Sequence, residues 1–257
     1  DKCTDKGSRN CISRISTSVV DVWLDHCCCP NTITTNMRIS SQDLFYATLA
    51  YADIFDYPLT LRECFLFSLF TSKNIRKTSG RIKSKKVHGT VYYFLSGRED
   101  VVATRLTREH YAKEKWRKAG IVAKALGRIP TVCLVGVTGG LAMNNAKHND
   151  DIDLYVVTQI GTLWITRFFV TIFVSLLGVR RAPKDREVQD TFCLNMFTSA
   201  KGMSIPEGER DIFSAHEVVQ MTPLWEKAGT YKKFLIKNRW AENYVPNAWR
   251  EKMQDQK

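Results

Sequence analysis

The sequence predicts an α+β fold, in which a mixed sheet flanked by helices follows a small N-terminal domain. Three observations lead to this prediction. Hydrophobic residues recur at helical spacing from Ser41 onward and again through a long charged segment, 99–126. The composition, 44% hydrophobic over 257 residues, is sufficient for a hydrophobic core. Short apolar runs that are typical of strands occur at 91–95, 132–137, 154–157 and 191–198.

The first 36 residues differ in composition from the remainder of the chain. They contain five of the eight cysteines, and the first methionine is Met37. The run Cys27-Cys28-Cys29 lacks the two-residue spacer of common zinc knuckles, and no second pair follows at a matching distance. The stretch also lacks the pattern of a secretory signal. We therefore expect residues 1–36 to be a disordered or non-native extension, and the cysteine-poor remainder to belong to a cytoplasmic protein.

Residues 37–98 have the pattern of a small winged-helix-like domain. Two short helices are predicted, one over 41–52 and one that begins at a capping box formed by Thr60 and Glu63. A basic segment and the strand-like run 91–95 follow these helices. Short helices followed by a hairpin are the order of elements expected for such a domain.

The basic segment makes nucleic acid one candidate partner of this domain. The formal net charge of +12 favours anionic partners, but charge alone does not choose among them. Winged-helix domains can contact DNA phosphates through a helix and the wing, whereas many others pack against their own enzyme or a partner protein. The candidate phosphate contacts are Arg76, Lys77, Arg81, Lys83, Lys85 and Lys86.

A connecting helix is predicted over 99–128, followed by a second domain, 129–257, that ends in helices. Within this domain, the stretch 162–179 is apolar enough to suggest a membrane span. It contains Arg167 and several hydroxyl side chains, however, and Arg180 follows it. A helix buried against the sheet explains the stretch as well, and we favour that interpretation, so that no membrane partner is predicted.

A glycine pair and two aspartates within 134–158 form the centre of the second domain. A hydrophobic strand is followed by Gly139 and Gly140, a short helix-compatible segment and a second strand. Because side chains alternate along a strand, Asp151 and Asp153 project from one face and the residue between them from the other. Neighbouring carboxylates repel each other unless a cation joins them, so the pair suggests a divalent-metal site. The glycines would let the backbone approach a phosphate closely.

The glycine pair, a gap of ten residues and the motif Asp151-Ile152-Asp153 resemble the signature of the DNA polymerase beta-like nucleotidyltransferase superfamily. The wider run TGGLAMNNAKHNDDIDLYVVT, with YADIFDYPLT upstream and AHEVVQMTPLW downstream, is similar to uncharacterised bacterial nucleotidyltransferase-domain proteins. The resemblance implies a nucleotidyltransferase-type sheet and a Mg²⁺-dependent enzyme. Such an enzyme moves a nucleoside monophosphate from an NTP to an acceptor hydroxyl and releases pyrophosphate. The acceptor is left open among a small molecule, a protein side chain and an RNA end.

The resemblance also implies roles for individual residues. Asp151 and Asp153 would bind two Mg²⁺ ions, which stabilise the attacking and leaving oxygens of an in-line displacement. The implied nucleotide contacts are the phosphate-binding Gly139 and Gly140 and the hydroxyl of Thr138. Arg167, near the start of the apolar helix, is either a further phosphate contact or a surface residue.

A third acidic residue on a later strand usually completes the site of this superfamily. Asp190 precedes the strand-like run 191–198, whereas the interior of that run contains Asn195 and no acid. We favour Asp190 as the third catalytic residue. If Asn195 holds that position instead, one metal is bound less tightly. The alternative function is then a nucleotide-sensing protein with little or no turnover that binds nucleic acid or a protein partner.

Overall fold

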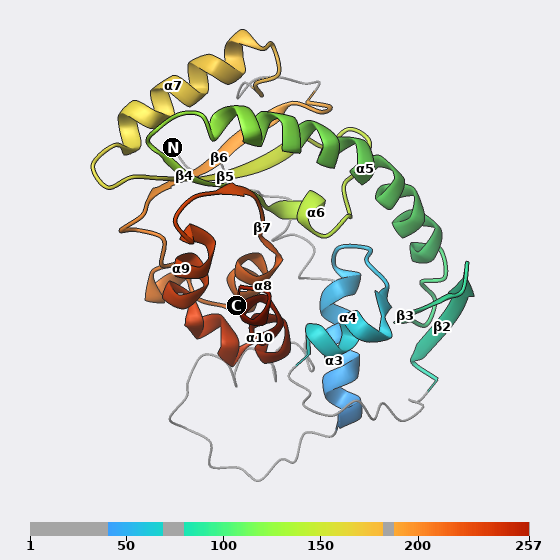
Figure 1. Ribbon diagram of the computed structural model, residues 1–257. Coiled ribbons are helices and arrows are strands. Elements are labelled where there is room, and N and C mark those ends of the chain that lie inside the picture. Colours follow the sequence, from blue (N-terminus) through green and yellow to red (C-terminus); the bar gives the residue numbers. More distant parts are fainter. Residues whose placement is uncertain (1–40, 69–79, 182–187, 257) are drawn as a thin grey trace. The chain divides into compact units, whose positions relative to one another are not determined.

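The computed structural model describes residues 41–68, 80–181 and 188–256 (Figure 1). The chain divides into two compact units, Asp1–Val102 and Ala103–Lys257. The division falls at the beginning of α5 (Val101–Leu126), within the segment expected to connect the two domains. The expected extension, residues 1–36, lies outside the described residues.

The N-terminal unit combines short helices with a small antiparallel sheet. Its strands pair in the order β1-β3-β2. The predicted capping box at the beginning of α4 is confirmed, because the Thr60 hydroxyl accepts a bond from the Glu63 amide and the Thr60 amide donates to Glu63 Oε2 at 2.7 Å. The described elements are α3 (Ser41–Asp53), β1 (Leu59–Thr60), α4 (Leu61–Leu66), β2 (Ile82–Val87) and β3 (Thr90–Leu95).

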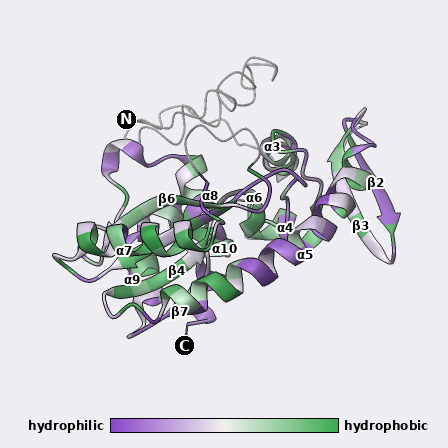
Figure 2. Cartoon of the chain, turned by 90° about the horizontal axis from the view of Figure 1, so that it is seen from above, coloured by the Kyte–Doolittle hydropathy of each residue, from purple (hydrophilic) through white to green (hydrophobic). Residues whose placement is uncertain are grey.

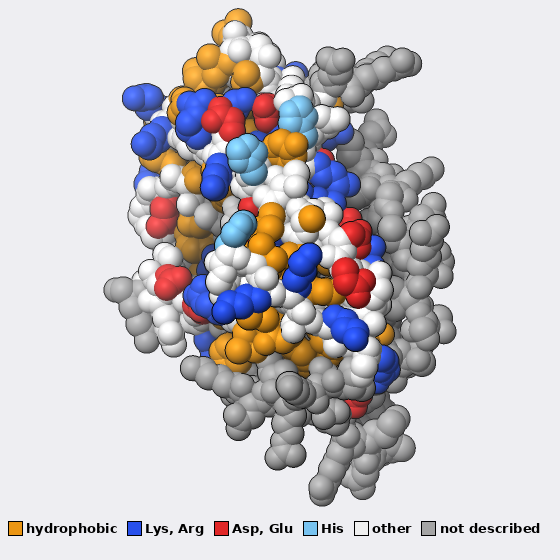
Figure 3. Space-filling model, turned by 90° about the vertical axis from the view of Figure 1, so that its right-hand side faces the viewer, with side chains coloured by type: hydrophobic (Ala, Val, Ile, Leu, Met, Phe, Trp, Pro, Cys, Tyr) orange, Lys and Arg blue, Asp and Glu red, His pale blue; other side chains and the backbone are white. Residues whose placement is uncertain are grey.

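Four of the basic residues predicted to contact phosphates lie on β2 or directly before it, and their side chains are exposed. These residues are Arg81, Lys83, Lys85 and Lys86. Arg76 and Lys77 lie outside the described residues. Figure 3 shows Lys and Arg side chains on one face of the molecule, interspersed with acidic and hydrophobic ones. These observations do not identify a nucleic-acid partner, so contact of the basic residues around β2 with nucleic acid stays a prediction.

The C-terminal unit contains a four-stranded mixed sheet within the described residues, which confirms the predicted α+β fold. The strand order is β6-β5-β4-β7, with β5 and β6 parallel and the other pairs antiparallel. The edge strand β7 was not predicted; it contains Pro223, which an edge strand tolerates. The elements are β4 (Val132–Val137), α6 (Gly139–Ala142), β5 (Ile152–Thr158), α7 (Leu163–Leu176), β6 (Phe192–Ser199), η2 (Glu207–Glu209), α8 (Ile212–Gln220), β7 (Thr222–Glu226), α9 (Thr230–Lys237), η3 (Arg239–Asn243) and α10 (Pro246–Gln254).

The central strands β4 and β5 are covered on both faces of the sheet. Ile152 and Leu154 of β5 are fully buried in a core cluster with residues of α5 and α7, which lie together on one side of the sheet in Figure 1. On the other face, the ring of Tyr155 lies 5.6 Å from that of Phe234 on α9. Burial on both faces explains why these strands are nearly continuous hydrophobic runs in the sequence.

Helix α7 consists mostly of hydrophobic residues (Figure 2). It buries one narrow stripe of side chains and exposes most of its other large apolar side chains. The buried stripe is Thr166, Val170 and Val174, so the predicted packing of this segment on the sheet is confirmed for one side of the helix. An open groove of about 580 Å³ lies between α7 and the end of α5. Within the described residues, the helices are all too short or too polar to span a membrane. The large hydrophobic side chains that α7 exposes are Trp164, Ile165, Phe168, Phe169, Ile172 and Leu176.

Buried His216 on α8 predicts a loss of stability in mild acid. Its Nδ1 donates to the Ile212 carbonyl at 2.9 Å, and burial lowers its pKa from 6.5 to about 4. The unfolded chain therefore binds a proton that the folded chain does not, between about pH 6.5 and about pH 4. We expect this histidine to remove about 3 kcal/mol of stability as the pH falls through that window.

The measurement is urea unfolding of the wild type and of His216→Gln at several pH values between 7 and 4. Subtracting the two curves removes the contribution of all other titrating groups. The difference in the free energy of unfolding between the two proteins should change by about 3 kcal/mol as the pH falls from about 6.5 to about 4. Equal pH dependence in the two proteins would contradict the assignment.

Candidate functional site

The turn after β4 brings a glycine pair against the beginning of β5. Thr138 follows the buried strand β4, and its amide donates to the carbonyl of Asp153 at 3.1 Å, which continues the antiparallel ladder. Gly139 then adopts φ +66°, a left-handed conformation that glycine reaches without steric cost. A short turn of helix, α6, closes with a bond of 2.8 Å from the Asn145 amide to the Gly140 carbonyl.

Asp151 and Asp153 lie side by side at the beginning of β5, as the alternation of the sequence predicted. The parallel register between β5 and β6 places Cys193 directly beside Asp153. One carboxylate oxygen of each aspartate and the Sγ of Cys193 all lie within 4.8 Å of one another. Within the described residues, these three side chains form a group that could hold a metal ion.

Gly139 contacts this group through its backbone. A β carbon at position 139 would lie 2.7 Å from Oδ2 of Asp153, closer than van der Waals contact allows. Glycine therefore suits this position both for its positive φ and because the Asp153 carboxylate occupies the space that a side chain would enter. The glycine turn and the aspartate pair thus form one site.

The electrostatics of the group favour the addition of a cation. Burial, and next the charge of Asp151, raise the pKa of Asp153 to about 6. Burial, and next the charges of both aspartates, raise the pKa of the Cys193 thiol to about 12. Among the described residues, Arg181 supplies a positive charge beside the group: its guanidinium donates to Oδ2 of Asp151 at 2.5 Å, and its side chain is 43% exposed. This hydrogen bond raises the pKa of Arg181.

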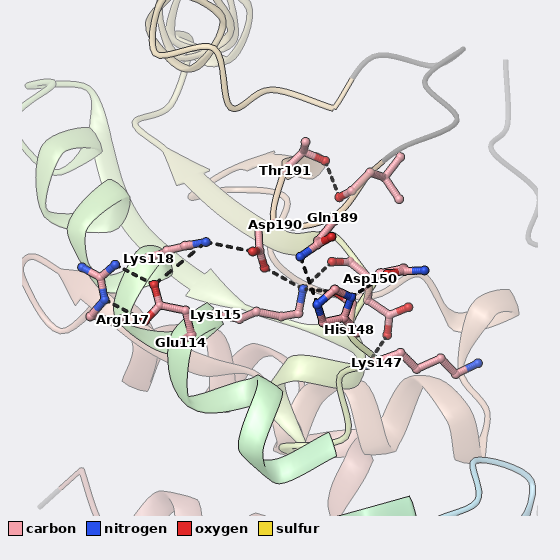
Figure 4. A network of polar contacts seen from close by, with 12 residues as sticks. Glu114, Lys115, Arg117, Lys118, Lys147, His148, Asp150, Gln189, Asp190 and Thr191 are labelled. Carbon is pink, nitrogen blue, oxygen red and sulfur yellow. Dashed lines mark hydrogen bonds and ion pairs between the residues drawn. The ribbon is translucent and has the colours of Figure 1, made fainter. Parts of the chain in front are cut away.

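Asp190 lies in a separate ion cluster (Figure 4). Its two carboxylate oxygens accept bonds of 2.8 Å each from Lys115 and Lys118 of α5. Burial alone would raise the pKa of Asp190, but the hydrogen bonds and the positive charges of the two lysines together outweigh that effect, and the pKa lies below its ordinary value. Asp190 has φ +58°, which aspartate tolerates in turns. The structure does not bring Asp190 into the group of Asp151, Asp153 and Cys193.

Lys115 ties the segments that precede β5 and β6 to α5. Its side chain is only 2% exposed. The ammonium donates to the carbonyls of His148 and Asp150, at 3.2 and 2.6 Å, and to Asp190. The Asp190 amide in turn donates to the Asp150 carbonyl at 3.3 Å. The position of Asp151, the next residue along the chain, therefore depends on this buried lysine.

Of the other residues predicted to contact nucleotide, two lie in the glycine turn and one lies on α7. Thr138 and Gly140 flank Gly139 in the turn. Arg167 lies on α7, with its guanidinium 5.4 Å from the ring of Phe197 and 6.0 Å from that of Trp164. Its described contacts are thus with aromatic side chains, and a role in phosphate binding stays a prediction.

Three residues of the site were not identified from the sequence: Lys115, Arg181 and Cys193. Lys115 resembles its many charged neighbours in α5, and only its burial distinguishes it. Arg181 follows an apolar helix, where an arginine pair is also expected on the surface. Cys193 lies within a strand-like run, and its place beside Asp153 depends on the parallel pairing of strands that are far apart in the sequence.

Comparisons with known proteins add little to this description. No family model matches the sequence, and no curated protein matches it. A comparison with solved structures found a chain described as "Crystal structure of the toxin-antitoxin with AMP-PNP", at a TM-score of 0.31 and 16% identity. The match covers 53% of this chain and 96% of that chain. This similarity is too low to assign a fold or a function.

Proposed function

We propose that this protein is a nucleotidyltransferase that moves a nucleoside monophosphate from an NTP to an acceptor hydroxyl, with release of pyrophosphate. One observation supports this proposal most directly. Asp151 and Asp153 lie side by side, and the carboxylate of Asp153 lies against the backbone of Gly139. Both features suit a metal-bound triphosphate, because carboxylates hold the cation and a glycine turn lets phosphate oxygens approach the backbone.

The two carboxylates fit Mg²⁺, which prefers oxygen ligands and keeps several waters. Asp151 and Asp153 would hold and orient the ions. When bound, Mg²⁺ would neutralise negative charge on the transferred phosphoryl group and on the leaving pyrophosphate. The third donor, the sulfur of Cys193, is not a ligand that Mg²⁺ normally takes.

The remaining residues of the turn would position the nucleotide. The amides of Gly139 and Gly140 would donate to phosphate oxygens, with the hydroxyl of Thr138 beside them. Asp190 is the third carboxylate that the resemblance implies, but to act in the reaction it would have to leave Lys115 and Lys118. The proposal therefore assigns metal binding to Asp151 and Asp153.

The test is transfer of label from α-labelled NTPs to candidate acceptors in the presence of Mg²⁺. Asp151→Asn and Asp153→Asn should each lower the rate by about 100-fold or more, because a metal contributes several kcal/mol to the transition state. Asp150→Asn is the matched control. The carboxylate of Asp150 accepts a bond from the Lys147 amide at 2.8 Å, and this variant should retain most of the activity.

Equal loss in all three variants would point to a folding defect and not to a metal site. An absence of transfer with every acceptor, together with unchanged NTP binding in Asp151→Asn and Asp153→Asn, would refute the proposal.

A second candidate function is nucleotide sensing with little turnover, with a partner bound through the winged-helix-like domain. It is favoured by two observations on the described residues. The donor beside the aspartates is a thiol, and Asp190 is paired with two lysines. Nucleotide binding that needs Asp151 and Asp153 but leads to no transfer would support this alternative.

A further inference from the structure

Cys193 is fixed in place by the backbone of two paired strands. Ile152 pairs with Phe192, and Asp153 pairs with Cys193, in the parallel ladder between β5 and β6. Two of the three donors of the group, those of Asp153 and Cys193, are therefore carried by paired strands, and the third belongs to Asp151, the residue directly before β5. A tetrahedral cation holds its ligand atoms about 3.5 Å apart, so small side-chain rotations from the present separations of up to 4.8 Å would close the site.

The environment of Cys193 differs from that of the other two cysteines among the described residues. Cys64 and Cys133 are buried, and neither belongs to a group of potential metal ligands there. Cys193 is only partly buried and hydrogen-bonds to the carboxylate of Asp153. A thiol that packs in a core is inert, whereas one that shares a site with two carboxylates is placed as a third ligand.

The chemistry of the donors distinguishes between cations. Mg²⁺ takes oxygen ligands almost exclusively, so it would use the two carboxylates and leave the sulfur aside. Zn²⁺ and Co²⁺ accept carboxylate and thiolate together, and three protein ligands with one open position are the usual arrangement of a catalytic zinc site.

We propose that Asp151, Asp153 and Cys193 form a binding site for a thiolate-accepting divalent cation of the Zn²⁺ class, with Cys193 as the ligand that selects it over Mg²⁺. The open position would accept water or an oxygen of a bound phosphate. The thiol proton passes to solvent when the sulfur binds the metal. Arg181 bonds to Asp151 from an exposed position and would compete with the cation for that carboxylate. The inference uses the site of the proposed function but does not require turnover.

Cobalt binding provides a direct test, because a thiolate bound to Co²⁺ gives a near-ultraviolet charge-transfer band that oxygen ligands do not give. The test uses the full chain with Cys3, Cys11, Cys27, Cys28 and Cys29 replaced by serine, so that those thiols do not contribute. We expect the band to saturate at one equivalent of Co²⁺. Zn²⁺ should displace it at stoichiometric concentration, whereas excess Mg²⁺ should not.

Cys193→Ser in this background should abolish the band and weaken Zn²⁺ binding by about tenfold or more, with Mn²⁺ binding changed by less than about threefold. Cys133→Ser is the matched control and should keep the band. Co²⁺ binding without the band in the parent protein would overturn the proposal, as would a band that persists in Cys193→Ser. The competition by Zn²⁺ and Mg²⁺ in the parent does not depend on whether a variant folds.

This result is separable from the proposed function. A thiolate band in a protein that transfers no nucleotide to any acceptor, and whose NTP binding is unchanged in Asp151→Asn and Asp153→Asn, would support the metal site and refute the transferase. Mg²⁺-dependent transfer without a band would do the opposite.

Discussion

Replacing Lys115 with methionine is expected to lower the free energy of unfolding of the C-terminal unit by about 3 kcal/mol. The ammonium is 2% exposed and donates to two carbonyls and to Asp190. Methionine fills a similar volume but leaves those buried acceptors without their donor, and removing one partner of a buried ion pair typically costs 3–5 kcal/mol. We expect a loss at the lower end of this range, because Asp190 keeps its ion pair with Lys118 and its side chain is 23% exposed.

Urea unfolding followed by tryptophan fluorescence measures this change. Lys118→Met is the matched control, since it removes a bond of the same length to the same carboxylate from a side chain that is 33% exposed. That variant should lose less than about 1 kcal/mol. Equal losses in the two variants would show that burial does not distinguish the lysines.

Lys115→Met should also weaken metal binding, because the Asp150 carbonyl that precedes Asp151 loses its bond to α5. A stability loss without any change in metal affinity would mean that this lysine supports the fold but does not position the site.

The parts of the fold that depend on local sequence were predictable. The capping box of Thr60 and Glu63 is set by residues three apart, and the buried strands β4 and β5 are set by their apolar runs. The projection of Asp151 and Asp153 from one face also follows from the period of a strand. For these features the residues that determine the structure are neighbours in the chain.

The parts that depend on pairing between distant segments were not predictable. Cys193 reaches Asp153 only because β6 adds in parallel to β5 in one register. The edge strand β7 is a short run that contains a proline, and its identity as a strand comes from the bonds it makes to β4. Lys115 and Asp190 are 75 residues apart in sequence, and neither position predicts the other.

The second large effect is expected for Gly139→Ala, which should reduce divalent-metal binding by about tenfold or more with a stability loss of only about 1 kcal/mol. A β carbon at this position would lie 2.7 Å from Oδ2 of Asp153, and the carboxylate can move away more easily than the backbone of the turn. The movement takes a ligand out of the metal-binding group. The stability loss reflects the cost of placing alanine at φ +66°.

Gly178→Ala separates these two effects, because Gly178 has φ +67° and, chain neighbours aside, no heavy atom of the described residues lies within 4 Å of an added β carbon. This variant carries the same backbone cost but no contact with a carboxylate, so it should lose about 1 kcal/mol and bind metal normally. Calorimetric titration with Mn²⁺, which suits carboxylate ligands, compares the two proteins. If Gly139→Ala bound Mn²⁺ as tightly as Gly178→Ala does, the contact between the glycine turn and Asp153 would have no part in the site, and the strongest support for a metal-bound triphosphate at this turn would be lost.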